Sequence, residues 1–183
     1  LALAAALGTI PDAAAARLGS IDFTPCTLEA TGLPMSVVAQ CGTLEVPEDP
    51  AAPDGRRITL ALAWIPASGE AQPDPVVMIA GGPGQSALES YPAASAAFSD
   101  IRKNRHVLLV DQRGTGGSNR LACEDEEAEG MFADATAPTV EEAAAVATRC
   151  RDQLSAHADL RLYTTGIAIQ DLEAVRLAVG APS

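Results

Sequence analysis

Two short apolar runs, each followed at once by a glycine-rich loop, indicate the fold class of this chain. Residues 75–80 read PVVMIA and run into GGPG at 81–84, and residues 107–110 read VLLV and run into DQRGTGGS at 111–118. Such apolar, β-branched runs are typical of strands buried on both faces of a parallel sheet. The Ala- and Ser-rich stretch between them is expected to form a helix, with Pro92 near its first turn. Buried strands that alternate with helices predict an α/β domain with a mainly parallel sheet.

The segments before these runs predict a β-hairpin. Residues 40–46 read as a short strand that Pro47 ends, residues 57–65 alternate weakly as a second strand, and turn-forming residues lie between the two. Residues 17–32 are expected to be irregular.

Two helices are expected after the second glycine-rich loop. Thr139 and Glu142 have the spacing of a capping box, and one face of the helix that they begin would carry Ala143, Ala147, Cys150 and Leu154. A last helix is expected to begin near Thr164 or Thr165, to end before Gly180, and to bury Ala168, Leu172, Val175 and Val179. The chain stops where the next parallel strand should begin, so the predicted sheet is unfinished.

Composition and charge exclude several classes of partner. The chain has 183 residues, of which 48% are hydrophobic and 20% charged, as in ordinary globular domains. Its 12 basic and 24 acidic residues give a formal net charge of −12. An acidic surface repels phosphate backbones and anionic lipids, so neither nucleic acid nor a membrane surface is expected as a partner.

The first residues favour export from the cytoplasm. The chain begins with the apolar run LALAAAL, and small residues follow at 13–16. An apolar run followed by an A-x-A site is typical of a secretory signal peptide, so residues 1–16 are interpreted as the remnant of one, and the protein as secreted or periplasmic. The alternative is an ordinary Ala-rich helix, which Gly8 and Pro11 disfavour. No later run is long enough to span a membrane, so no membrane contact is expected after signal removal.

The four cysteines favour disulfides over a metal site. Cys26, Cys41, Cys123 and Cys150 include no C-x-x-C pair, and His106 and His157 are the only histidines. No metal and no cofactor are therefore expected. Three pairings are possible; pairing of neighbours, Cys26–Cys41 and Cys123–Cys150, closes two short loops and is preferred. Four buried free thiols are the alternative, which an oxidising compartment disfavours.

The first glycine-rich loop is the strongest candidate for chemistry. Loops at the carboxyl ends of parallel strands are where such folds place their sites, and glycines let backbone N–H groups approach a substrate oxygen. Gly82, with Gly81 as second choice, would offer an N–H to the oxyanion of a tetrahedral intermediate, and Pro83 and Gly84 would support it. The alternative is a tight Gly-Pro turn without function.

The second glycine-rich loop is interpreted as support for that site. Asp111 and Arg113 can pair and fix the loop, and Gly114 permits a sharp reversal. A phosphate-binding loop is disfavoured because neither G-x-x-x-x-G-K-[ST] nor G-x-G-x-x-G occurs in either loop.

Together the two loops resemble those of the proline iminopeptidase and tripeptidyl aminopeptidase branch of the α/β-hydrolases, peptidase family S33. The entry hairpin (CGTLEVP, 41–47), YTT at 163–165, DLEAVR at 171–176 and the spaced Cys123 and Cys150 agree with it. The resemblance covers about residues 41–180. Ala80 stands where many members have His, which the exported tripeptidyl-type members tolerate.

The resemblance implies a partial α/β-hydrolase fold in residues 17–183, an N-terminal β-hairpin followed by parallel strands with helices and truncated before the nucleophile elbow. No G-x-S-x-G occurs in the chain, so nucleophile, acid and base would all lie beyond residue 183. Ser86 and Ser118 lack an elbow context, and both histidines read as surface or capping residues. These 183 residues alone are therefore expected to be inactive.

The function implied for the full protein is that of an exported serine hydrolase, an aminopeptidase that releases N-terminal residues or short peptides by acyl transfer. Its substrates would be peptides or small esters and amides. Alternatives with the same fold are an esterase, a lactonase or an epoxide hydrolase. A non-catalytic binding module and a nucleotide-binding domain are the alternatives outside that chemistry.

Overall fold

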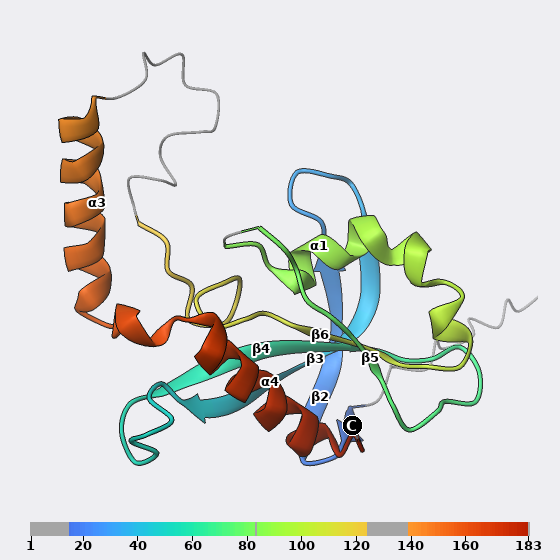
Figure 1. The fold of residues 1–183 in the computed structure, drawn as a ribbon. Helices are drawn as coiled ribbons and strands as arrows, with labels where there is room; N and C mark the ends of the chain where they lie inside the picture. Colours follow the sequence, from blue (N-terminus) through green and yellow to red (C-terminus); the bar gives the residue numbers. More distant parts are fainter. Residues whose placement is uncertain (1–14, 83, 124–138, 183) are drawn as a thin grey trace, which may run out of the picture.

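The computed structural model describes residues 15–82, 84–123 and 139–182, which form a mixed β-sheet with helices on both faces (Figure 1). The six described strands have the order β1-β2-β3-β4-β6-β5. Their bounds are β1 Ala16–Leu18, β2 Ile21–Glu29, β3 Ser36–Pro47, β4 Arg57–Ile65, β5 Val76–Met78 and β6 Val107–Val110. The α-helices are α1 Ala87–Ala94, α3 Val140–Ser155 and α4 Thr165–Val179, and short 3-10 helices lie at Ser95–Phe98, Ile101–Lys103 and Leu160–Leu162.

The sheet is less parallel than the sequence predicted. Only β5 and β6 pair in parallel among the described strands, and the other four pairings are antiparallel. Parallel neighbours need a long crossover, and α1 with the two 3-10 helices after it provides one between β5 and β6. Strands β1, β2, β3 and β4 follow one another along the chain without an intervening helix, so each pairs with the next as an antiparallel neighbour. The α/β character is confirmed, and the mainly parallel sheet is not.

Helices cover the two faces of the sheet because its central strands are apolar on both sides. In β6, Leu108 and Val110 pack in one core with Val175 and Val179 of α4. Val107 and Leu109 point the other way, into a second core that contains Tyr91 of α1. Figure 1 shows α1 and α4 on opposite sides of the central strands. The burial of β6 on both faces confirms the prediction from VLLV.

The other apolar run is not buried in the same way. The run at 75–80 forms β5, which spans only Val76–Met78. Val77 and Ile79 are 44% and 49% exposed. The reason is that β5 lies at one edge of the sheet, with β6 as its one paired neighbour among the described residues.

The amino-terminal region is more regular than expected. Residues 17–32 contain β1 and β2, and β2 pairs with β3 from Thr24↔Cys41 to Glu29↔Ser36. Ile21 and Phe23 are both buried while their neighbours in β2 are exposed, an alternation that the sequence carries. Pro25 and Gly32 obscured it. The strand expected at 40–46 also begins earlier, at Ser36.

The helices follow their predicted boundaries better than their predicted burial. The capping box of Thr139 with Glu142 and the left-handed Gly180 after α4 are both present. In α3, however, only Leu154 is buried, because most of this helix stands away from the sheet (Figure 1). Pro92 lies in the last turn of α1 and not near the first.

Both preferred disulfides are present. Cys26–Cys41 joins β2 to β3, and Cys123–Cys150 joins the segment after the second glycine-rich loop to α3. No helix in the described ranges is long and apolar enough to cross a membrane. The predicted signal remnant at 1–16 lies almost wholly outside the described residues, which begin at 15.

Candidate functional site

The two glycine-rich loops lie at the same edge of the sheet. β5 and β6 are parallel and in register from Val76↔Val107 to Met78↔Leu109, so the residues that follow them leave the sheet side by side. This edge therefore brings Ala80 and Ser86 of the first loop next to Asp111 and Gln112 of the second.

The first loop has a backbone that requires glycine. Gly82 and Gly84 have φ values of 87° and 84°, which side chains with a Cβ rarely adopt. Pro83, predicted as support, lies outside the described residues. The N–H groups of Gly81, Gly82 and Gly84 donate no hydrogen bond to any other described residue. Backbone N–H groups without a partner can donate hydrogen bonds to an oxyanion and stabilise it.

Asp111 fixes the first loop to the second. Its carboxylate is buried, and Oδ1 accepts hydrogen bonds from Ser86 Oγ at 2.8 Å and from the N–H of Leu88 at 3.2 Å. Oδ2 accepts a third from the N–H of Gly117 at 2.9 Å. Ser86 in turn caps α1 by accepting from the N–H of Glu89. One carboxylate thus sets the position of α1 and of the chain that enters it.

Arg113 does not pair with Asp111, contrary to the sequence interpretation. Its guanidinium forms a bidentate ion pair with Asp171 of α4, with distances of 2.6 and 2.7 Å. It also donates to the backbone oxygens of Glu48 and Leu162. Arg113 therefore joins the second loop to the end of β3, to the segment before α4 and to α4 itself.

Glycines allow the second loop to reverse over Asp111. Gly114 and Gly116 have φ values of 82° and 46°, and the N–H of Gly114 donates to the oxygen of Ser118. A Cβ built on Gly116 would lie 2.0 Å from Asp111 Oδ2, so no larger residue fits there. The reversal predicted at Gly114 is present.

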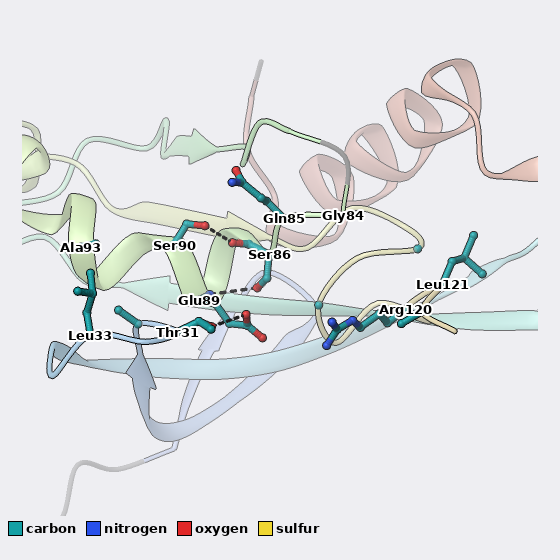
Figure 2. Close-up of a pocket in the computed structure, with 14 residues that line it drawn as sticks. Thr31, Leu33, Gly84, Gln85, Ser86, Glu89, Ser90, Ala93, Arg120 and Leu121 are labelled. Carbon is teal, nitrogen blue, oxygen red and sulfur yellow. Dashed lines mark hydrogen bonds between the residues drawn. The ribbon is translucent and has the colours of Figure 1, made fainter. Parts of the chain in front are cut away.

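Two cavities meet at the first loop. The smaller, of about 200 Å³, lies between the two loops and the start of α4, and its lining includes Gly82, Gly84, Gln85, Gln112 and Tyr163. The larger, of about 800 Å³, lies on the other side of Gly84 and Gln85, which line both. Figure 2 shows the larger cavity with Ser86, Glu89 and Arg120 around it.

Neither Ser86 nor Ser118 forms a hydrogen bond with a histidine in the part of the chain that the structure describes. Ser86 Oγ is bound to Asp111, and Ser118 Oγ donates to the backbone oxygen of Asp111 at 2.6 Å. His106 precedes β6 and Asp111 follows it, so about 16 Å of strand separates them. His106 Nδ1 also accepts the N–H of Ala67 at 3.0 Å. Among the described residues, no cluster of His, Cys, Asp and Glu could hold a metal ion.

Two buried carboxylates that brace the site, those of Glu48 and Asp171, were not singled out from the sequence. Glu48 is buried and accepts from the N–H of Asp159 and the hydroxyl of Tyr163. Burial raises the pKa of Tyr163 and the charge of Glu48 acts in the same direction, against a hydrogen bond from Asn119. Asp171 interrupts the apolar stripe of α4. A charged residue on a buried helix face indicates a buried partner, so the sequence carried a signal for Asp171. Glu48 lies in a proline-rich turn and gave none.

Comparison with known proteins finds sequence similarity to hydrolases. The chain is 30% identical to serine protease Hip1 of Mycobacterium tuberculosis over 90% of its own length and 34% of that protein's. It is 38% identical to carboxylesterase B of Mycobacterium tuberculosis over 44% of its length (16% of that protein's), and 36% identical to tripeptidyl aminopeptidase of Streptomyces lividans over 63% (22% of that protein's).

The chain is similar to part of a serine protease, a carboxylesterase and an aminopeptidase. It spans about a third of the length of the protease Hip1. No protein-family model matches it. The names of the relatives agree with the hydrolase chemistry that the glycine-rich loops predicted, at the level of hydrolase and not of a particular substrate.

Proposed function

We propose that this chain is part of an exported serine hydrolase of the α/β-hydrolase type, close to peptidase family S33. The observation that carries the proposal is the set of unused N–H groups in the loop after β5. Gly82, with Gly81 as the second choice, would donate to the oxygen of the substrate's carbonyl group as it becomes negative. The small cavity against Gly82 is where that carbonyl would lie.

The reaction would be acyl transfer to a serine. The serine oxygen attacks the carbonyl, its proton goes to a general base, and the tetrahedral oxyanion is stabilised by N–H donors that each contribute about 3–4 kcal/mol. As the intermediate collapses, the bond to the leaving amine or alcohol breaks and the base returns the proton to that group; water then hydrolyses the acyl-serine by the same steps. In the proposed protein, nucleophile, acid and base are supplied from outside these 183 residues. The strand before the nucleophile would pair with the open edge of β5 and cover the apolar groove between β5 and α4, which is lined by Val77, Ile79 and Leu172.

An aminopeptidase is the first choice of activity. Two of the similar proteins are named as peptidases, a serine protease and a tripeptidyl aminopeptidase. Export is supported by the two disulfides, which persist in oxidising compartments. The similarity to carboxylesterase B favours an esterase as the second candidate.

The coding sequence downstream of Ser183 is the first test. We expect a G-x-S-x-G motif within about ten to fifteen residues, after a short β-branched run. The protein with that segment should react with a fluorophosphonate and cleave peptide p-nitroanilides, and residues 1–183 alone should do neither. A stop codon at that point, or serine-dependent turnover by residues 1–183, would contradict the proposal.

The role of Gly82 has its own test. Gly82→Ala places a Cβ at a φ of 87° and 3.3 Å from the Gln85 side chain, which displaces the N–H. We expect kcat to fall about 10²- to 10³-fold, as when an oxyanion donor is lost. Gly166→Ala is the matched control, because its Cβ would meet nothing within 4 Å. Equal kcat values for the two variants would exclude Gly82 as the donor.

A further inference from the structure

Gln85, at the end of the first glycine-rich loop, presents its side-chain amide to the small cavity. It lines this cavity of about 200 Å³ together with Gly82 and Gly84. The three heavy atoms nearest to the position of a Cβ on Gly82 all belong to the Gln85 amide, at 3.3, 3.4 and 3.5 Å. The amide therefore lies against the residue whose N–H is proposed to bind the carbonyl oxygen of the substrate.

The backbone fixes where Gln85 lies. Its N–H donates to the oxygen of Gly82 at 3.4 Å and closes a turn, in which Gly84 has a φ of 84° that glycine adopts readily. On the other side, Ser86 is held by the buried carboxylate of Asp111. Figure 2 shows the side chains of Gln85 and Ser86 pointing to opposite sides of the chain that enters α1. Gln85 is thus beside Gly82 before a substrate binds, and donors that are already in position stabilise a developing charge best.

Three other polar side chains in the wall of the small cavity are already bound to protein. Gln112 donates to a backbone oxygen of the first loop, Arg113 to a carboxylate of α4, and Tyr163 to a buried carboxylate. The side-chain hydrogen bonds around the two loops do not include the Gln85 amide in the described part of the chain. A carboxamide carries two N–H donors, so Gln85 can offer them to a ligand in the cavity.

We propose that the Gln85 amide is a side-chain donor to the oxyanion, beside the backbone N–H of Gly82. The inference rests on the proposed hydrolase function and adds a catalytic residue that touches the reacting oxygen. As the carbonyl oxygen of the substrate becomes negative, Gln85 Nε2 donates a hydrogen bond to it, a role that side-chain amides fill in other oxyanion holes. The two ends of the amide lie at nearly equal distances from the Cβ position on Gly82, and a negative oxygen attracts the N–H end.

The test uses the complete protein with its catalytic serine, and hydrolysis of p-nitrophenyl butyrate and of a peptide p-nitroanilide. Gln85→Met keeps the length of the side chain and removes both donors, so kcat should fall about 10²-fold, the lower end of the range for one oxyanion donor. The lower end applies because Gln85 is exposed and water competes for the same oxygen. KM should change less than about threefold, because the contact forms only in the transition state.

Gln72→Met is the matched control. Gln72 is also an exposed glutamine, and it lines none of the cavities described. Its replacement should leave kcat within about twofold of the unaltered protein, as for surface changes away from a site.

A pair of inhibitors reports the oxyanion directly. Propyl trifluoromethyl ketone adds to the serine and forms a tetrahedral adduct with a negative oxygen, whereas propyl methyl ketone binds as the unreacted carbonyl. Gln85→Met should weaken the first by the same factor as kcat/KM and the second by less than about twofold, because only the adduct resembles the transition state.

Gln85→Glu tests which end of the amide acts. The carboxylate has nearly the same shape but only accepts hydrogen bonds. It would face the oxyanion with a like charge, so kcat should fall further than in Gln85→Met. A kcat equal to that of the unaltered protein would show that this position needs an acceptor, and would overturn the proposal.

The outcomes distinguish this inference from the proposed function. If the unaltered protein hydrolyses neither the ester nor the peptide p-nitroanilide, the hydrolase function fails and this inference with it. If it hydrolyses them but Gln85→Met matches Gln72→Met, raises KM alone, or weakens both ketones equally, only the role of Gln85 is overturned.

Discussion

At the scale of single residues, Asp111 is the group on which the site depends most. It is 1% exposed, and its three donors are a hydroxyl and two backbone N–H groups, with no cation among them. A buried carboxylate is stable only when its oxygens are hydrogen-bonded. The sequence predicted that Asp111 pairs with Arg113, and this partner is wrong, because Arg113 binds Asp171 of α4 instead.

Replacing Asp111 by Asn should lower both stability and activity. The amide turns one acceptor into a donor that faces an N–H or a hydroxyl, so we expect a loss of about 1.5–3 kcal/mol in the free energy of unfolding, the range for hydrogen bonds to charged groups. Urea denaturation measures it. Asp100→Asn, in an exposed pair with Lys103, should change stability by less than about 1 kcal/mol. Equal losses would contradict the role given to Asp111.

His106 makes stability depend on pH. Burial lowers the pKa of His106 below the ordinary value, because removal from water favours the neutral imidazole over the charged one. The unfolded chain then takes up a proton first as the pH falls, and the stability that is present above about pH 6.5 is lost progressively below it. We expect the free energy of unfolding to fall between pH 7.5 and pH 5.5, and less so in His106→Gln. His157→Gln, at an exposed position, should keep the slope of the unaltered protein.

At the scale of elements, α4 is held by an ion pair as well as by its apolar stripe. The side chains of Arg113 and Asp171 are 1% and 6% exposed, so both charges are removed from water. Val175 and Val179 supply the apolar contact with the sheet. The stripe could be predicted from residues three and four apart, whereas the ion pair joins residues 58 positions apart.

Removing one partner of this pair should loosen α4. Arg113→Met leaves the carboxylate of Asp171 buried without a cation, which costs about 3–5 kcal/mol. The double variant with Asp171→Leu should lose less than the sum of the single variants, because no uncompensated charge remains. Thermal or urea unfolding of the four proteins gives the coupling energy. Arg151→Met, in an exposed pair, should lie within about 1 kcal/mol of the unaltered protein; simple additivity would contradict the coupling.

At the scale of the whole molecule, the edge along β5 exposes apolar side chains and unpaired backbone groups. Val77 and Ile79 are about half exposed beside α4 and line an apolar groove of about 340 Å³. No described strand pairs with the outer side of β5. Open edges and apolar grooves of this kind promote association.

The 183-residue chain on its own should therefore associate through this edge. We expect light scattering to detect oligomers and a hydrophobic dye to bind, and both signals to fall in Ile79→Lys, because the added charge cannot be buried at low cost. Val140→Lys adds the same charge at an 81% exposed residue of α3 and should leave the signals unchanged. Equal association of the two variants would show that β5 is not the contact.

Features that depend on neighbours along the chain could be predicted from the sequence. These are the buried run of β6, the glycine-rich loops, the capping box of α3, the stop at Gly180, and disulfides between successive cysteines. Tertiary structure alone decided the partners of Asp111 and Arg113, the buried turn residue Glu48, the exposure of β5 and that of α3. Hydrogen-bond partners and burial depend on which distant segments the fold brings together, and no local pattern encodes them.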